Sequence, residues 1–185
     1  MTNEENFAVF DQFFNSGKNF CALTVDRLES FNASGFKFCM VKVVDKKIVK
    51  ERIFEFAPIN ITKKLQKELG KDVVAYYMSL PTFDTLWPEI GNMLESHRIV
   101  TYDMGCESKV LSYFLHHYQI EFGTFSCSFA ATKTGWRLRK YLEKEGIELD
   151  EGNDLALPRL IAEIWMSDSE ENAEKYWQRK MNRNF

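Results

Sequence analysis

The stretch from Phe20 to Glu29, FCALTVDRLE, constrains the fold of this chain more than any other segment. Nearly every position from Phe20 to Val25 is apolar on both faces, which is typical of a central strand in a sheet that is covered on both sides. Ligands of such sheets bind at the strand ends. Asp26 is therefore a candidate site residue. The alternative is that Asp26 and Glu29 only end the strand and begin a loop.

Composition narrows the class of protein. A chain of 185 residues with 45% hydrophobic residues fits one domain with an ordinary core. The net charge of -3 and the pI near 5.7 give no general attraction to nucleic acid, so nucleic-acid binding needs a local patch or metal ions. The four cysteines form no CxxC pair, which argues against structural zinc. With no basic leader and no long apolar run, we expect a cytoplasmic protein without membrane contact.

The order of the predicted elements indicates an α/β fold. Three antiparallel strands come first, joined in part by a hairpin turn over 45–47, and helices then alternate with short strands. The expected strands cover 20–25, 36–44, 48–56, 98–102 and 125–129. The expected helices cover 62–69, 83–96, 107–117, 136–145 and 155–165, with a loop over 70–80. This order predicts a mixed sheet flanked by helices.

Three regions are expected along the chain. Residues 1–19 contain a predicted amphipathic helix over 4–15, with several phenylalanines on one side. Residues 20–166 form the predicted domain, without an internal repeat. Residues 167–185 are highly charged and are expected to be an exposed helix or a frayed tail.

Several segments resemble, in order, the DnaQ-like 3′–5′ exonucleases, the polymerase III epsilon-type enzymes of the DEDD group. The resemblance covers about residues 20 to 166 and implies a ribonuclease H-like fold. The family's FxALDxE strand resembles Phe20–Asp26, its APTFxxxW segment resembles Leu80–Trp87, and its VAHNxxFDxxVL motif resembles Val100–Leu111. Further likenesses are Cys127-Ser128 for a Cys-Thr pair, Leu138–Ile147 for LxxLxxxxGI, and Asp154–Leu160 for HxALxDA.

The resemblance also implies a chemistry. Family members use two divalent metals, Mg²⁺ or Mn²⁺, to hold the scissile phosphate and activate a water. Four carboxylates bind the metals, because these hard cations prefer oxygen ligands. Two of the carboxylates lie two residues apart on the first strand and so share one face. A histidine shortly before the last aspartate acts as general base.

This sequence departs from the family at each of those positions. Thr24 replaces the first Asp, Asp26 replaces the Glu, and Glu107 replaces the second-motif Asp. Arg159 replaces the last Asp, Asp154 replaces the His, and Tyr102 and Asp103 replace the His-Asn pair. At most two metal ligands remain, Asp26 and Glu107, and each differs in length from the residue it replaces.

Arg159 places a positive charge where the resemblance implies a metal ligand. A unit charge about 4 Å from a divalent ion costs about 8 kcal/mol at an effective dielectric near 20, as an upper bound. We therefore expect Arg159 to replace the metal and to pair with Asp26 or Glu107, and also with Asp103. The alternative is that Arg159 extends into solvent. In a different alignment, Asp26, Glu107 and Asp154 form a reduced catalytic site, but Leu149 and Asp150 stand where the histidine would be.

A basic patch is the remaining candidate site. Its members are Lys133, Arg137, Arg139 and Lys140, which the sequence places at or near one helix and which are candidates for phosphate contact. The alternative is that they are only the solvated face of an amphipathic helix.

Three functions therefore compete. We favour an exonuclease-fold protein that has lost two-metal catalysis, holds no cofactor, and binds single-stranded nucleic acid, a nucleotide or a protein partner. The alternative is a divergent 3′–5′ exonuclease that uses Mg²⁺ or Mn²⁺ with Asp26, Glu107 and Asp154. The third is a structural scaffold that docks through its aromatic surface and charged tail.

Overall fold

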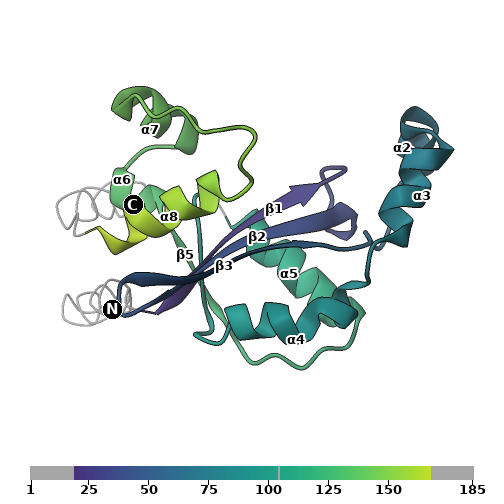
Figure 1. The fold of residues 1–185 in the computed structure, drawn as a ribbon, viewed down its shortest axis with the longest axis horizontal. Coiled ribbons are helices and arrows are strands. Elements are labelled where there is room, and N and C mark those ends of the chain that lie inside the picture. Colours follow the sequence, from purple (N-terminus) through teal and green to yellow (C-terminus); the bar gives the residue numbers. More distant parts are fainter. Residues whose placement is uncertain (1–18, 104, 168–185) are drawn as a thin grey trace, which may run out of the picture.

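The computed structural model describes residues 19–103 and 105–167. The helix expected over 4–15 and nearly all of the charged segment 167–185 lie outside the described residues. A five-stranded sheet with the order β3-β2-β1-β4-β5 forms the centre of the molecule (Figure 1). Its strands are β1 (Phe20–Arg27), β2 (Gly35–Val44), β3 (Lys47–Glu55), β4 (Arg98–Thr101) and β5 (Ser126–Phe129).

Strand directions match the predicted fold class. The pairs β1–β2 and β2–β3 are antiparallel, whereas β1–β4 and β4–β5 are parallel. The predicted mixed sheet of ribonuclease H-like type is therefore confirmed. β1 is the middle strand, with neighbours on both edges and helices on both faces, which explains why its sequence is apolar at nearly every position.

Helices cover both faces of the sheet. Within the described residues they are α2 (Lys63–Leu69), α3 (Lys71–Ser79), α4 (Phe83–Met93), α5 (Cys106–His117), α6 (Ala131–Thr134), α7 (Leu138–Glu145) and α8 (Ala156–Met166). The helices α4 and α5 pack on one face, and α8 packs on the other. In the described part of the chain, no helix is both long enough and apolar enough to span a membrane.

The alternation of β1 divides its side chains between two hydrophobic clusters. Cys21 and Leu23 pack with the buried residues of α4 and α5. Phe20 and Ala22 pack with those of α8, including Trp165. Since side chains two apart share a face of a strand, Thr24 and Asp26 follow Ala22 on the α8 face, beyond the apolar part of the core.

Helix α3 was not expected, because residues 70–80 were predicted to be a loop. None of the residues in α3 is buried, and its apolar residues form one run, Val73–Met78, instead of the one-sided period that predicts a helix. Gly70, with φ of +83°, separates α3 from α2. The remaining elements agree with the prediction within a few residues, although α4 ends at Met93 rather than at 96 and the four-residue α6 was missed.

Local signals account for several element ends. The predicted hairpin turn is formed by Asp45 and Lys46, both with positive φ. Thr82 precedes α4 as expected, but its hydroxyl lies 2.8 Å from that of Thr85 and does not cap the helix backbone. Pro158 is the third residue of α8, in the first turn, where a missing amide proton is tolerated.

Candidate functional site

An ammonium group joins two of the predicted catalytic carboxylates. The Nζ atom of Lys37 lies 2.9 Å from Asp26 and 3.0 Å from Asp154. The Lys37 side chain is 12% exposed, whereas Asp26 and Asp154 are 51% and 42% exposed. The cation is therefore held inside the site, while the carboxylates still face solvent.

The strand register explains why Lys37 lies there. Asp26 of β1 is directly opposite Lys37 of β2, and the register shifts by one residue immediately afterwards. Val41 of β2 packs in the cluster on the α8 face, so Lys37, four residues earlier, points to that face too. Asp154 reaches the pair from the turn that precedes α8, a turn ordered by the side chains of Asp150 and Asn153.

The local charges favour a protonated lysine. Partial burial alone would lower the pKa of Lys37, but the hydrogen bonds to Asp26 and Asp154, together with their negative charges, outweigh it and raise that pKa. Lys37 is therefore a permanent cation at neutral pH. Two carboxylates and one ammonium leave the cluster with a small negative charge.

Glu107, the third predicted carboxylate, belongs to a different environment in the first turn of α5. It accepts a hydrogen bond from Sγ of Cys106 at 3.6 Å. Burial raises the pKa of Glu107, and the nearby charge of Arg27 only partly opposes this effect. The carboxyl is thus poorly compensated as an anion.

The other motif replacements contact neighbouring parts of the fold. Thr24 is directly opposite Cys39 in the β1–β2 ladder. Tyr102 is buried, and its hydroxyl lies 3.0 Å from that of Thr134. Burial also raises the pKa of Tyr102 to about 12, so it stays neutral. Burial raises the pKa of Asp103, and the backbone amide of Leu138, the first residue of α7, partly opposes this effect.

The expectation that Arg159 pairs with Asp26, Glu107 or Asp103 is wrong. Its guanidinium binds Glu51 of β3 through two hydrogen bonds, one of them between Nη2 and Oε2 at 2.8 Å. Glu51 is directly opposite Val41, which packs beneath α8, so the α8 side chain meets β3 rather than β1. The residue that supplies a cation to the predicted metal site is Lys37.

These residues do not fit the metal centre that the resemblance implied. In the described part of the chain, no group of three or more His, Cys, Asp or Glu side chains is arranged to hold a metal ion. Asp26 and Asp154 share Lys37, and Glu107 contacts Cys106. Binding of a metal by the two predicted ligands, Asp26 and Glu107, stays a prediction. The contacts of these two carboxylates do not favour it.

The four residues of the predicted basic patch do not form one surface, because one of them is buried and three are exposed. Lys133 is only 9% exposed, and its Nζ donates hydrogen bonds to the backbone carbonyls of Trp165 and Ser167, the latter at 2.7 Å. It therefore satisfies carbonyls at the end of α8 and lies over the Trp165 ring. The expectation that Lys133 contacts phosphate is not supported by this burial.

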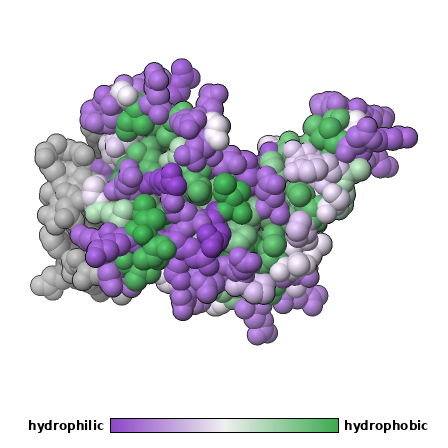
Figure 2. Space-filling model, viewed as in Figure 1, coloured by the Kyte–Doolittle hydropathy of each residue, from purple (hydrophilic) through white to green (hydrophobic). Residues whose placement is uncertain are grey.

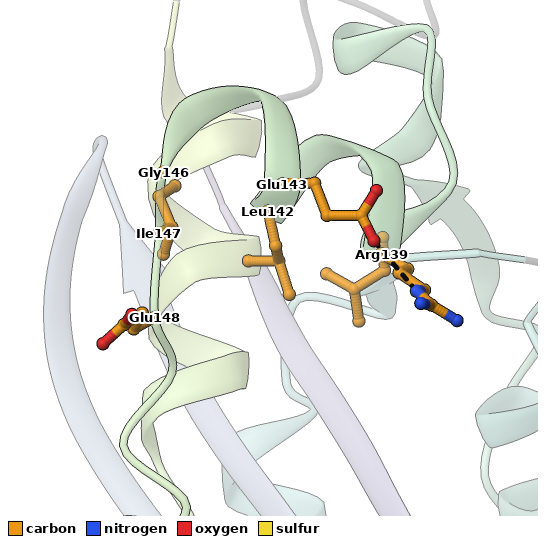
Figure 3. A pocket seen from close by; sticks show the side chains of 7 residues that line it. Arg139, Leu142, Glu143, Gly146, Ile147 and Glu148 are labelled. Carbon is orange, nitrogen blue, oxygen red and sulfur yellow. Dashed lines mark hydrogen bonds and ion pairs between the residues drawn. The ribbon is translucent and has the colours of Figure 1, made fainter.

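The other patch residues lie on or next to α7 and are exposed. Arg139 forms an ion pair with Glu143, 2.9 Å away and one helical turn later. Lys140 lies over the Trp136 ring at 6.0 Å. Figure 3 shows Arg139 and Glu143 beside Leu142 and Ile147, at a hollow of about 520 Å³. Paired charges beside an apolar lining do not favour phosphate binding at this hollow. Arg137 is the fourth cation of the predicted patch.

Lys37 is the site residue that the sequence interpretation missed. A signal for it was present, because the alternation of β2 places Lys37, Cys39 and Val41 on one face. The pairing of Asp26 with Lys37 depends on the length of the connection between the strands, which includes a 3₁₀ turn over Asn32–Ser34. That connection is too irregular to fix the register from sequence.

Comparison with solved structures supports the fold, whereas comparisons of the sequence found no match. No family model matches the chain, and no curated protein matches it by sequence. A solved structure of a 3′-exonuclease, described by its specific recognition of the 3′ end of histone mRNA stem-loop, is similar with a TM-score of 0.55 and 13% identity. The similarity covers 92% of this chain and 70% of that one.

A second solved structure, Exonuclease X in complex with 5′ overhanging duplex DNA, has a TM-score of 0.46 and 12% identity. It covers 85% of this chain and 99% of the other. Identities this low concern the fold alone. The predicted resemblance to 3′–5′ exonucleases is confirmed at that level through the first structure.

Proposed function

We propose that this protein uses an exonuclease fold to bind single-stranded nucleic acid and does not carry out two-metal hydrolysis. The observation that supports this most is the position of Lys37, with its Nζ within 3.0 Å of both Asp26 and Asp154. An ammonium of the protein stands between two of the three carboxylates that a reduced metal site would need.

Simple electrostatics opposes the binding of a metal ion at this position. A divalent ion about 4 Å from Nζ of Lys37 meets a repulsion of about 8 kcal/mol at an effective dielectric near 20, as an upper bound. Asp26 and Asp154 also lose their existing hydrogen bonds if a metal displaces the amine. Lys37 and a divalent ion therefore compete for the same carboxylates.

The ligand class follows from the fold and from the neighbour with the higher TM-score. That neighbour is described as recognising the 3′ end of an RNA stem-loop, so RNA is the first ligand to test and single-stranded DNA the second. A nucleotide or a protein partner is the next candidate. The cytoplasmic location expected from the sequence stays a prediction.

A divergent metal-dependent 3′–5′ exonuclease is the second candidate function. One observation favours it: Asp26 and Asp154 are each more than 40% exposed, so a metal has access to them if the flexible lysine stem moves away. Glu107, whose pKa is raised by burial, would then have to approach the pair.

One experiment distinguishes between the two candidate functions. Fluorescence anisotropy with a labelled oligonucleotide in EDTA measures binding, and gel analysis of the same oligonucleotide in Mg²⁺ or Mn²⁺ measures cleavage. Our proposal expects binding without cleavage. Metal-dependent cleavage that is abolished by Asp26→Ala would support the exonuclease instead.

A further inference from the structure

Helices α2 and α3 form a projecting arm, residues 63–79, that contributes nothing to the core. Neither helix has a buried residue, and Figure 1 shows both standing away from the sheet. Helices of 7 and 9 residues are marginal in water without tertiary contacts. Such an arm gains stability when it packs against a ligand.

The arm is attached at the end of the sheet where Asp26 lies. The carboxylate of Glu29, just after β1, accepts hydrogen bonds from the backbone amide and the hydroxyl of Thr62, at 3.0 and 2.5 Å. Thr62 in turn caps α2 through the amide of Leu65. The base of the arm is therefore fixed relative to the Lys37 site.

A row of aromatic rings leads from Phe36, the residue before Lys37 in β2, into the arm. Nζ of Lys37 lies 5.9 Å from the centre of the Phe36 ring. Phe36 contacts Tyr77 with ring centres 5.0 Å apart, and Tyr77 contacts Tyr76 at 5.4 Å. Tyr76 is 53% exposed, so it offers a free ring surface at the outer end of the row.

The arm is basic although the whole chain is acidic. Four exposed lysines, Lys63, Lys64, Lys67 and Lys71, stand against two acidic residues, Glu68 and Asp72. Lys64 lies 3.9 Å from Glu68, whereas the other three lysines form no ion pair with any described residue. Figure 2 shows apolar side chains among hydrophilic ones on the arm. Val73 and Met78 of α3 are also exposed.

We infer that this arm binds the backbone and a base of a single-stranded nucleic acid whose chain leads toward the Lys37 site. Lysines attract phosphates, and an exposed tyrosine stacks on any base without sequence preference. This combination fits a single strand better than a duplex, whose bases are already stacked on one another. The inference depends on the proposed function, because it names the surface that carries out the binding.

The test uses the full chain and labelled oligouridylate and oligothymidylate of about 20 nucleotides, in EDTA, over a range of salt concentrations. One variant replaces Lys63, Lys67 and Lys71 by glutamine, and a second is Tyr76→Ala. The matched control replaces three cations of β3, Lys47, Lys50 and Arg52, by glutamine. Because the arm buries no side chain, these arm variants are expected to keep the circular dichroism spectrum and melting temperature of the parent.

We expect the triple arm variant to lower the slope of log affinity against log salt by about 2, since each phosphate contact to a single strand contributes about 0.7. We expect Tyr76→Ala to weaken binding about 5- to 150-fold with an unchanged salt slope. The β3 control should bind like the parent.

Two results would overturn the inference while leaving the proposed function intact. One is that the parent binds and both arm variants bind equally well. The other is that the arm variants abolish only a self-association seen by sedimentation, which would assign the arm to a second copy of the chain. If the parent binds neither oligonucleotide, the proposed function itself fails.

Discussion

Nζ of Lys37 lies 2.9 Å from the carboxylate of Asp26, its direct partner across the β1–β2 ladder. The same amine reaches Asp154 at 3.0 Å. A side chain of the protein thus provides the positive charge that brings these carboxylates together. The effect of this cation on metal binding can be tested by removing the charge of Lys37.

Replacing Lys37 by methionine should allow a divalent ion to bind. Asp26 and Asp154 then face each other without a cation, which should cost about 1 kcal/mol of stability in the absence of metal, because both carboxylates are well exposed. At a Mn²⁺ concentration ten times the dissociation constant, binding should add about 1.4 kcal/mol and raise the melting temperature by about 3–6 °C.

Lys42→Met is the matched control for this experiment. Lys42 is on the same strand, is also 12% exposed, and also forms an ion pair, with Glu95 at 2.8 Å. Its removal should not create a response to Mn²⁺. An equal Mn²⁺ response in the unmodified protein would show that Lys37 does not exclude the metal.

Replacing Lys133 by methionine should destabilise the fold without a direct effect on ligand contact. The amine donates to the carbonyls of Trp165 and Ser167, and hydrogen bonds of charged groups contribute about 1.5–3 kcal/mol. We expect the free energy of unfolding, measured with urea, to fall by that amount. Lys140→Met, at an exposed position of the same predicted patch, should change stability by less than about 0.5 kcal/mol. Equal effects of the two substitutions would contradict the structural role of Lys133.

The contact between Arg159 and Glu51 should make part of the stability depend on pH. The hydrogen bonds from Arg159 lower the pKa of Glu51. A lowered folded-state pKa gives stability that is present above the unfolded value of about 4.3 and is lost as the pH falls through the folded value. Glu51→Gln should therefore be less stable than the parent at pH 7, with the difference shrinking as the pH falls below about 4.

Glu55→Gln, at an exposed position of the same strand, serves as the control in the same thermal scans. It should follow the parent over the whole pH range. The interpretation of Arg159 would be wrong if Glu51→Gln showed no deficit at pH 7, or if Arg159→Ala restored Mn²⁺ binding.

Much of the fold could be predicted from the sequence because burial leaves a periodic pattern. The continuous apolar run of β1 marks a central strand, and Phe83, Ile90 and the inward residues of α5 mark helices that bury one side. Helix α3 buries no side chain, and its apolar residues form one uninterrupted run instead of a one-sided pattern. Helix α2 is equally exposed, but its polar sequence and the glycine that follows it predicted a helix over 62–69.

The candidate site was predicted less well, because its partners are set by register. The sequence identified Asp26 and Asp154, and the structure brings them together. Which cation joins them depends on the pairing of β1 with β2, whereas the position of Arg159 in the third motif predicted the wrong residue. Strand pairing across an irregular connection brings Lys37 to the two carboxylates, and neither the motif nor the periodicity of the sequence sets that pairing.

The proposal of nucleic-acid binding without two-metal hydrolysis is tested most directly with one labelled single-stranded RNA. Its binding and its cleavage are both measured, for the unmodified protein and for Asp26→Ala. Binding is measured in EDTA, and cleavage is measured in Mn²⁺ with protein in excess. We expect that both proteins bind the RNA and that neither shortens it from the 3′ end. Mn²⁺-dependent shortening by the unmodified protein, lost in Asp26→Ala, would contradict it.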